Sequence, residues 1–291
     1  MPSPLLLLIP THTPRYLGLV LAALAVQTRR PDTVVVSCDT DDPAIGVEIE
    51  HASGRAGMPI WWVRRAHHGG ERLCQVRNNG VRHIVESLGI TTGRLITLDG
   101  DTLAREDCLE GHARWADAGG ADVIYPYRVD VPEALSSALT PEMILERRAG
   151  LTLSNHDCER LSKRQRRYTR QLLLRKLRLG PAHKPKLLGG HYSVDLGWYL
   201  KLNGFDELYQ GWGFKDDEFA YRAAKLGATC RVAVDELIVF HLYHKTRQTS
   251  GRMADLPTAK RFARRAELPL VAEHGVRNPL PQNPVSATLL E

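Results

Sequence analysis

Cysteine is scarce in this sequence, and its copies lie far apart. There are five among 291 residues, and no two of them form a Cys-x-x-Cys pair. An odd, scattered set favours neither a disulfide framework nor a structural zinc site. Free thiols of this kind are typical of a reducing compartment, so the expected location is cytoplasmic. The five are Cys38, Cys74, Cys108, Cys158 and Cys230.

Long hydrophobic runs are also missing. Residues 5–9 form a short apolar run with no basic segment before it and no cleavage site after it, which argues against a signal peptide. Residues 16–26 are apolar but too few to span a bilayer. The sequence therefore predicts no transmembrane helix, and a contact with the inner face of a membrane would have to be peripheral.

Acidic residues are absent from one stretch, the basic segment 160–186, which holds eleven Lys or Arg. Because the whole chain has a net charge of only +6, the remainder is mildly acidic, and no nucleic-acid partner is expected. Leucines lie among these charges from Leu172 to Leu179. Two interpretations stay open: a basic helix lying on an anionic membrane near a lipid-linked acceptor, or a solvated insert packing its leucines on the body.

The first half alternates short apolar runs with helical patterns. The order β, α, β, β, α, β, α, β indicates an α/β fold with a mostly parallel sheet and helices on both faces. Strands are expected at 5–9, 33–37, 59–63, 94–98 and 121–126, and helices at 15–28, 73–88 and 108–118.

The second half is less regular, with expected strands at 191–194, 229–234 and 237–241, helices at 196–202, 216–226 and 253–267, and an extended tail. The predicted division is a nucleotide-binding half 1–130, an acceptor-binding half 131–250 that includes the basic insert 155–186, and a C-terminal helix and tail 251–291.

Two carboxylates follow one of the expected strands. Asp99 and Asp101 come directly after residues 95–98, with one glycine between them. Ligands of open parallel sheets bind beyond the carboxyl ends of the strands. Paired carboxylates there can hold Mg²⁺ or Mn²⁺, which prefer oxygen ligands and often bridge to a diphosphate. The alternative is an acidic turn without a ligand.

A second acidic group opens an expected helix behind two glycines and a tryptophan. Asp216, Asp217 and Glu218 suit a helix N-terminus for electrostatic reasons alone. That interpretation leaves Trp212 unexplained, because a tryptophan between glycines is suited to lying against a sugar. A carboxylate beside it could accept a proton from an attacking hydroxyl.

Two histidines follow a late strand. Residues three apart in an extended segment point to opposite faces, so His241 and His244 are not expected to bind one ion together. One of them could bind a metal, since imidazole accepts Mn²⁺. The alternative is a structural histidine.

These features together resemble a known family. The segments 9–11, 39, 76–80 and 98–101 are similar to the nucleotide-sugar half of the GT-A inverting glycosyltransferases, especially family 2. The segments 189–190, 204–207 and 211–219 resemble the acceptor half found in galactosyltransferases and polypeptide N-acetylgalactosaminyltransferases. The resemblance covers residues 5–247 in the expected order, and it implies a GT-A fold.

The resemblance also implies roles for individual residues. Asp216, or its neighbour Asp217, would be the catalytic base. Asp99, Asp101 and His241 would bind Mn²⁺ or Mg²⁺. Lys215 departs from the family, which commonly has Glu there. It is expected either to pair with a neighbouring carboxylate and lower its pKa, or to contact an acidic acceptor or a phosphate. The implied substrate-binding residues are Pro10, Thr11, Arg15, Asp39, Arg77, Asn78, Asp99, Gly190, Trp212, Gly213, Lys215 and Glu218.

The function predicted from this resemblance is metal-dependent, inverting transfer of a sugar, from a nucleotide donor that is UDP-linked in many relatives, to a hydroxyl of a glycan or lipid-linked acceptor. Polysaccharide biosynthesis would be the context. One rival is a nucleotidyltransferase of similar fold, although residues 10–14 lack the glycine-rich loop expected of one. The other is a non-catalytic protein that binds an acidic polymer in a salt-sensitive, metal-independent way.

Overall fold

Buried apolar strands form the centre of the molecule. The computed structural model describes residues 3–67, 69–119, 121–245 and 252–291. Strand β1 (Leu5–Thr11) is buried along its whole length, and β2 (Thr33–Cys38) and β4 (Arg94–Leu98) are buried almost as completely. Continuous apolar runs of this kind are typical of strands covered on both faces, as in parallel α/β sheets.

The main sheet has the strand order β11-β3-β2-β1-β4-β8-β6-β9. The first four strands of the chain pair in parallel, and β8 (His191–Asp195) inserts antiparallel between β4 and β6. The prediction of a mostly parallel sheet is therefore confirmed. The remaining members are β3 (Ile60–Arg64), β6 (Val123–Tyr125), β9 (Cys230–Val232) and β11 (Ser286–Leu290).

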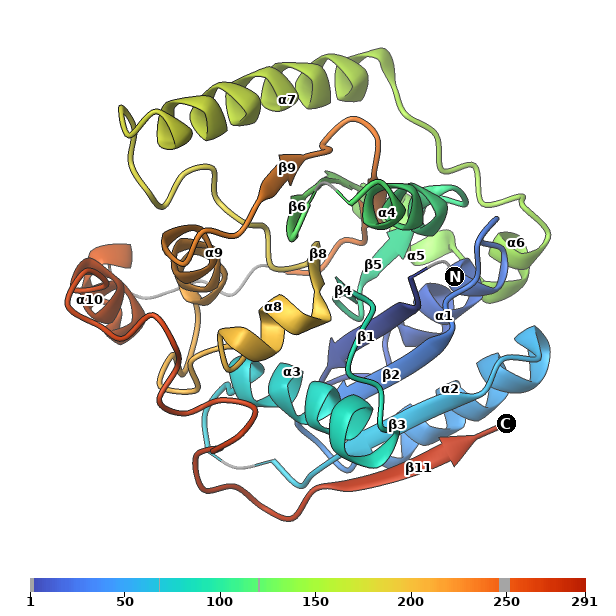
Figure 1. Ribbon diagram of the computed structural model, residues 1–291. Coiled ribbons are helices and arrows are strands. Elements are labelled where there is room, and N and C mark those ends of the chain that lie inside the picture. The colour runs from blue at the N-terminus through green and yellow to red at the C-terminus, as the bar shows by residue number, and fades with distance from the viewer. Residues whose placement is uncertain (1–2, 68, 120, 246–251) are drawn as a thin grey trace.

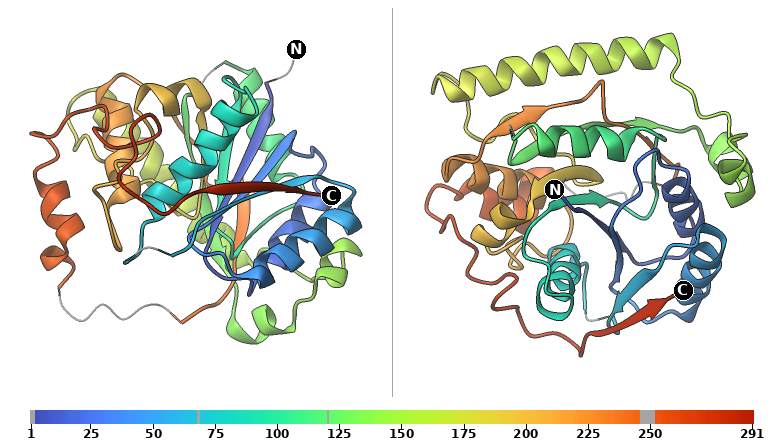
Figure 2. Two further views of the ribbon diagram at one scale, coloured as in Figure 1. Left: turned by 90° about the horizontal axis from the view of Figure 1, so that it is seen from below. Right: turned by 45° about the vertical axis from the view of Figure 1, so that its right-hand side comes forward.

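Helices cover both faces of this sheet (Figures 1 and 2). Helices α1 (Leu17–Ala25) and α2 (Pro43–Ala56) lie on one face, and α3 (Leu73–Arg82) lies on the other. Gly80 lets α3 approach closely, because an added Cβ would lie 3.2 Å from the Cβ of Ser37. Because β1, β2 and β4 pair in parallel, their carboxyl ends lie at one edge of the sheet.

A small second sheet lies next to that edge, with the order β5-β10-β7. Strand β10 (Ile238–His241) runs between β5 (Thr102–Ala104) and β7 (Tyr127–Asp130). Its register places His241 opposite Asp130 on one side and opposite Thr102 on the other. Residues from both halves of the chain therefore meet just beyond Asp101.

Helix α7 (Asn155–Lys176) contains most of the basic segment and lies on the outside of the molecule beyond β9 (Figure 1). It begins with a capping box between Ser154 and Asp157. The other helical elements are a π-helical turn (His83–Ser87), α4 (Cys108–Asp117), α5 (Glu133–Ala138), α6 (Pro141–Leu145), α8 (Leu196–Lys201), α9 (Lys215–Lys225), a 3₁₀ turn (Met253–Asp255) and α10 (Pro257–Ala263).

Several parts of the chain differ from the sequence-based expectation, which contained no element at β5, β7, α5 or α6. Helix α2 was not predicted; Asp42 caps it by accepting a hydrogen bond from the amide of Ala44. The last residues do not form a loose tail, because β11 pairs antiparallel with β3 and Gln282 exchanges hydrogen bonds with Asn79. Edge pairing satisfies the backbone groups that β3 would otherwise expose.

None of the helices in the described part of the chain combines the length and the apolar character that a bilayer span requires.

Candidate active site

Three strand ends converge on the turn Asp99–Asp101. The Asp39 amide donates to the Thr11 carbonyl at 3.4 Å, and the Gly100 amide donates to the Pro10 carbonyl at 3.3 Å. A Cβ on Gly100 would lie 2.6 Å from the hydroxyl oxygen of Thr11, so the turn tolerates only glycine there without rearrangement. Pro10, Thr11, Asp39 and the two carboxylates are therefore grouped as the sequence predicted.

Asp39 has a cationic partner that the sequence did not single out. Arg65 follows β3, its side chain is fully buried, and its Nη2 lies 2.7 Å from Oδ1 of Asp39. His67 Nδ1 lies 3.4 Å from the other carboxylate oxygen. Burial lowers the pKa of Arg65, and Asp39 partly offsets that cost. The only sequence signal for Arg65 is its position just past a strand end.

Arg77 joins the two halves of the site. Its guanidinium, fully buried on α3, lies 2.6 Å from Oδ1 of Asp216 and 3.5 Å from Oδ1 of Asp99. It also donates to the Gly189 carbonyl at 2.8 Å. Despite the burial, the two carboxylates raise the pKa of Arg77 well above its usual value. One cation thus holds the acid of the first half beside the acid of the second.

The electrostatics around Asp99 follow from this crowding. Burial raises the pKa of the Asp99 carboxyl to about 6, since Arg77 only partly offsets the lost solvation. Asp101 and Asp216 raise it further by repulsion. A group of carboxylates that resist being charged together is one that a cation would stabilise.

Asp101 lies among histidines. Its Oδ2 is 3.3 Å from Nε2 of His244 and 3.7 Å from Nε2 of His241. One ligand atom from each of these three residues lies within 4.8 Å of the other two, so the group could hold a metal ion. On the far side of the ring, Nδ1 of His241 lies 3.3 Å from Asp130.

The expectation that His241 and His244 face opposite ways is wrong. It assumed an extended segment, but β10 ends at His241. The next amide, that of Leu242, donates to the Asp101 carbonyl at 2.9 Å, and the chain leaves the strand. The two imidazole rings consequently lie 5.1 Å apart.

Asp216 and Asp217 begin α9 but face different partners. Asp216 points to Arg77 and to the Gly189–Gly190 turn, and a Cβ on Gly189 would lie 2.6 Å from Cγ of Asp216. Asp217 points away to Lys186, whose Nζ lies 3.3 Å from its Oδ2. Burial raises the pKa of Asp217. Of the two, Asp216 shares the cation of Asp99.

Comparisons with known proteins bear on this arrangement. Residues 178–245 match the family model described as the N-terminal domain of galactosyltransferase. The structure of residues 1–349 of S. aureus TarS in complex with UDP is 15% identical, with a TM-score of 0.52 over 82% of this chain and 60% of that one. GalNAc-T7 with UDP, GalNAc and Mn²⁺ is 16% identical, with a TM-score of 0.59 over 91% of this chain and 48% of that one.

The protein has a GT-A glycosyltransferase fold. The segment 178–245, which contains β8, α9 and β10, carries the match to the galactosyltransferase family model within that fold. The chain spans 60% of the TarS structure and about half of GalNAc-T7. By fold and by the matched segment, the chain is similar to glycosyltransferases.

Two residues expected to bind substrate have structural roles in this GT-A fold. Asn78 is fully buried, and its amide donates to Phe205 O and Glu207 and accepts from Tyr199 and Phe205 N. Its hydrogen-bonding capacity is used up in joining α3 to the second half. Glu218 is likewise buried, in an ion pair with Arg222.

The expectation for Lys215 is also wrong. Lys215 is buried and directs its ammonium to Glu71 and to the Gly211 carbonyl, 2.9 Å away, rather than to the acids that follow it. Successive residues of a helix point in different directions, so Lys215 turns from Asp216. Lys215 therefore ties α9 to the loop before α3.

The loop before α9 presents Trp212 to solvent with 45% of its surface exposed. The Trp212 carbonyl accepts a hydrogen bond of 2.8 Å from the Thr258 hydroxyl, and this bond anchors the loop. Gly213 and Phe214 both have positive φ, +91° and +62°.

The two remaining predicted site residues lie elsewhere. Gly190 lies close to the Asp99 carboxylate. Arg15 is exposed at the start of α1, with its guanidinium over the ring of Tyr16.

Gly189→Ala is expected to lower turnover by about a hundredfold, because the new methyl would displace the Asp216 carboxylate from its contact with Arg77. The midpoint temperature of thermal unfolding should be close to that of the wild type. Gly190→Ala is the matched control, since its Cβ would lie 3.3 Å from Asp99 and needs only a small shift. Equal turnover in both variants would contradict this assignment.

A second histidine group lies buried behind the site. His112 of α4 has its Nε2 2.8 Å from Nε2 of His191 and its Nδ1 2.9 Å from the Ser193 hydroxyl. Cys108 Sγ lies 3.8 Å from His191, so these residues too could hold a metal. Burial holds the pKa of His191 at about 3 and that of His112 well below 6.5. The hydrogen bonds explain the cluster as a neutral structural pair.

This pair predicts a pH dependence of stability. Below pH 6.5 both histidines take up protons in the unfolded chain but stay neutral in the native one, so their stabilisation is present above that pH and is lost as the pH falls toward 3. Each contributes about 1.4 kcal/mol of unfolding free energy per pH unit. In His112→Gln, urea titrations between about pH 4.5 and 6 should show a slope smaller by about that amount. An unchanged slope would contradict the neutral pair.

Proposed function

We propose that this protein transfers a sugar from a UDP-linked donor to an acceptor hydroxyl, with inversion at the anomeric carbon and with a divalent cation. The observation that supports this best is the Arg77 bridge, in which one guanidinium contacts Asp99 of the nucleotide half and Asp216 of the acceptor half. A donor bound at the strand ends would then have its reacting carbon close to an acceptor-side carboxylate. The neighbours GalNAc-T7 and TarS were solved with UDP, which favours this donor class.

The residues around Asp101 fit a divalent metal. Asp101, His241 and His244 offer one oxygen and two imidazole nitrogens within 4.8 Å of one another. Asp99 Oδ1 is buried without a hydrogen-bond partner among the described residues, so it has capacity for the same ion or for a ligand beside it. Mg²⁺ takes mainly oxygen ligands, whereas imidazole is accepted by Mn²⁺, so Mn²⁺ is the expected metal. GalNAc-T7 was solved with Mn²⁺.

When bound, such a cation supplies stabilisation of the negative charge that develops on the leaving diphosphate. The chain's own residues do the rest. Asp216 accepts the proton of the attacking hydroxyl at a carboxylate oxygen, and Arg77 orients Asp216 by the 2.6 Å contact. Gly189 and Gly190 leave room beside both carboxylates. Trp212 offers an exposed ring for the acceptor sugar, and Asp39 with Arg65 borders the nucleoside.

The experiment that tests this function is a panel of nucleotide sugars, with Mn²⁺, with Mg²⁺ and with chelator. We expect thermal stabilisation and slow hydrolysis for a UDP-sugar with Mn²⁺, and neither with chelator. The nucleotidyltransferase alternative predicts release of pyrophosphate from a nucleoside triphosphate and a sugar phosphate instead. Absence of any metal-dependent response to the sugar panel would overturn the proposal.

The peripheral membrane contact of the basic segment stays a prediction. Near the C-terminal end of α7, Leu173, Leu177 and Leu179 are exposed, which a solvated insert with all its leucines packed does not explain. Leu172 packs against the core. The vesicle experiment described below tests this contact together with its alternative.

A further inference from the structure

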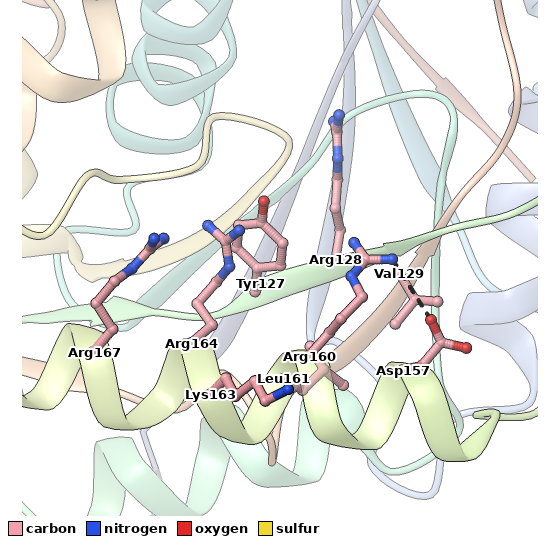
Figure 3. A pocket seen from close by; sticks show the side chains of 9 residues that line it. All are labelled: Tyr127, Arg128, Val129, Asp157, Arg160, Leu161, Lys163, Arg164 and Arg167. Atoms are coloured by element: carbon pink, nitrogen blue, oxygen red, sulfur yellow. Dashed lines mark ion pairs between the residues drawn. The ribbon is translucent and has the colours of Figure 1, made fainter.

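A cationic groove lies between α7 and β7, outside the catalytic group. It encloses about 240 Å³. Figure 3 shows the guanidinium groups of Arg160, Arg164 and Arg167 extending from one side of α7 toward β7. Its charged lining, here called the arginine groove, consists of Arg128, Arg160, Lys163, Arg164, Arg167 and the carboxylate of Asp157.

The arginine groove is built in advance of any ligand. Gln165 fixes α7 to the body, because its side chain donates to the Val232 carbonyl at 3.1 Å and accepts from the Val234 amide at 2.8 Å. Arg164 lies over the ring of Tyr127 at 3.6 Å. A cation stacked on an aromatic ring keeps its N–H groups available at the edge of its plane for an anion.

The positive charge of the groove is only partly neutralised by the protein. Arg160 has Asp157 at 3.8 Å, and Lys163 has Glu159 at the same distance, both loose contacts near the surface. Arg164 and Arg167 have no carboxylate within ion-pair distance anywhere in the described ranges. A concave site with two guanidinium groups outside any ion pair matches phosphate or carboxylate oxygens, which a guanidinium can bind in pairs.

The groove leads to the catalytic group. Arg128 Nε lies 3.2 Å from Asp130, and Asp130 lies 3.3 Å from His241 on the neighbouring strand. Arg128 and Asp130 are two positions apart in an extended strand, which is about 7 Å. Along α7 the cations recur from Arg160 to Arg167 over roughly 10 Å. A linear molecule lying in the groove would therefore run toward the metal-binding residues.

We propose that the arginine groove binds phosphate or carboxylate groups along the acceptor, so that the acceptor is an anionic chain rather than a neutral glycan. The identification of the bound anion as the acceptor rests on the proposed transferase function, whereas the anion-binding site rests on its own geometry. A chain fits a concavity between a helix and a strand, whereas a bilayer would need the cations on a protruding face. Stacking of nucleic-acid bases is disfavoured because Arg164 covers the face of Tyr127.

The test compares two variants of equal charge. Arg160→Gln/Arg164→Gln/Arg167→Gln removes three groove cations, and Arg166→Gln/Arg170→Gln/Lys176→Gln removes three that do not line the groove. Calorimetric titration with short-chain inorganic polyphosphate should give a dissociation constant raised about tenfold or more in the groove variant, and nearly unchanged in the control. Equal weakening in both would show a general charge effect and overturn the proposal.

Further titrations distinguish which kind of anionic molecule binds the groove. Vesicles with anionic lipid, and poly(U), are titrated against the same three proteins. If the groove cations matter only for vesicles or bind poly(U) in preference to polyphosphate, the acceptor proposal is overturned. With an active donor, the groove variant should raise KM for a phosphorylated oligosaccharide but not for its unphosphorylated form, and an equal KM effect on both would also overturn it.

Binding of UDP and Mn²⁺ to the same protein samples keeps the two proposals distinguishable. It should be the same in the wild type and both variants. If UDP and Mn²⁺ fail to bind the wild type while polyphosphate still depends on the groove, the transferase function fails and the anion site stands.

Discussion

Asp216→Asn is expected to lower kcat by roughly a hundredfold to ten-thousandfold, the range typical for loss of a general base. The amide has the shape of the carboxylate but cannot take the proton of the attacking hydroxyl. Arg77 keeps its contact with Asp99, so the affinity for the UDP-sugar should be nearly unchanged. Steady-state kinetics with the best donor of the panel, together with calorimetric titration of UDP in the presence of Mn²⁺, measures both quantities.

Asp217→Asn is the matched control for this experiment. Asp217 faces Lys186 rather than Arg77, so its loss should lower turnover far less. The two aspartates start the same helix, so each substitution removes one acid from the first turn of α9. If Asp217→Asn abolished turnover while Asp216→Asn did not, the base would be Asp217. Full activity in Asp216→Asn would remove that residue from the mechanism.

Asp101→Asn is expected to weaken Mn²⁺ binding by at least about a hundredfold and to lower activity in parallel. Asp101 is the only carboxylate in the group that it forms with His241 and His244, and an amide is a much poorer ligand for a hard cation. Titration of the metal-free protein with Mn²⁺ measures the affinity directly. A high Mn²⁺ concentration should restore part of the activity.

Two companion variants make this result specific. Asp130→Asn changes only the residue behind His241, so the loss of Mn²⁺ affinity should fall between about tenfold and a hundredfold, as for other outer-shell partners. His244→Gln tests whether the second imidazole takes part. Wild-type affinity in Asp101→Asn would contradict the metal site altogether, and wild-type affinity in His244→Gln would show that His244 merely lies near it.

Local patterns were enough for most of the strands that form the nucleotide half. The run Leu5–Ile9 becomes β1, because an unbroken apolar run must be buried on both faces, and the mainly apolar segment 94–98 becomes β4. Helix α2 was missed, because its apolar residues are few and its proline at the start resembles a turn. Strand β11 was missed because five residues at the end of a proline-rich stretch show no pattern that distinguishes pairing from coil.

Candidate site residues were predictable where a strand end carries them. Parallel strands must bring Thr11, Asp39 and Asp101 to one edge whatever the side-chain packing. Lys215 and Glu218 could not be placed in this way, since the partner of a helical residue depends on what packs against that face. Glu71 and Arg222 were unremarkable in the sequence, yet they are those partners.

The sequence by itself determined the α/β layering, the acidic strand end and the acidic start of α9, because these depend on periodicity and on neighbouring residues along the chain. The tertiary structure alone decided that Arg77 joins Asp99 to Asp216, that His244 turns back to Asp101, and that α7 closes a cationic groove against β7. Each of these contacts joins residues more than 20 positions apart, and such pairing is determined by how the layers pack, which no local pattern encodes.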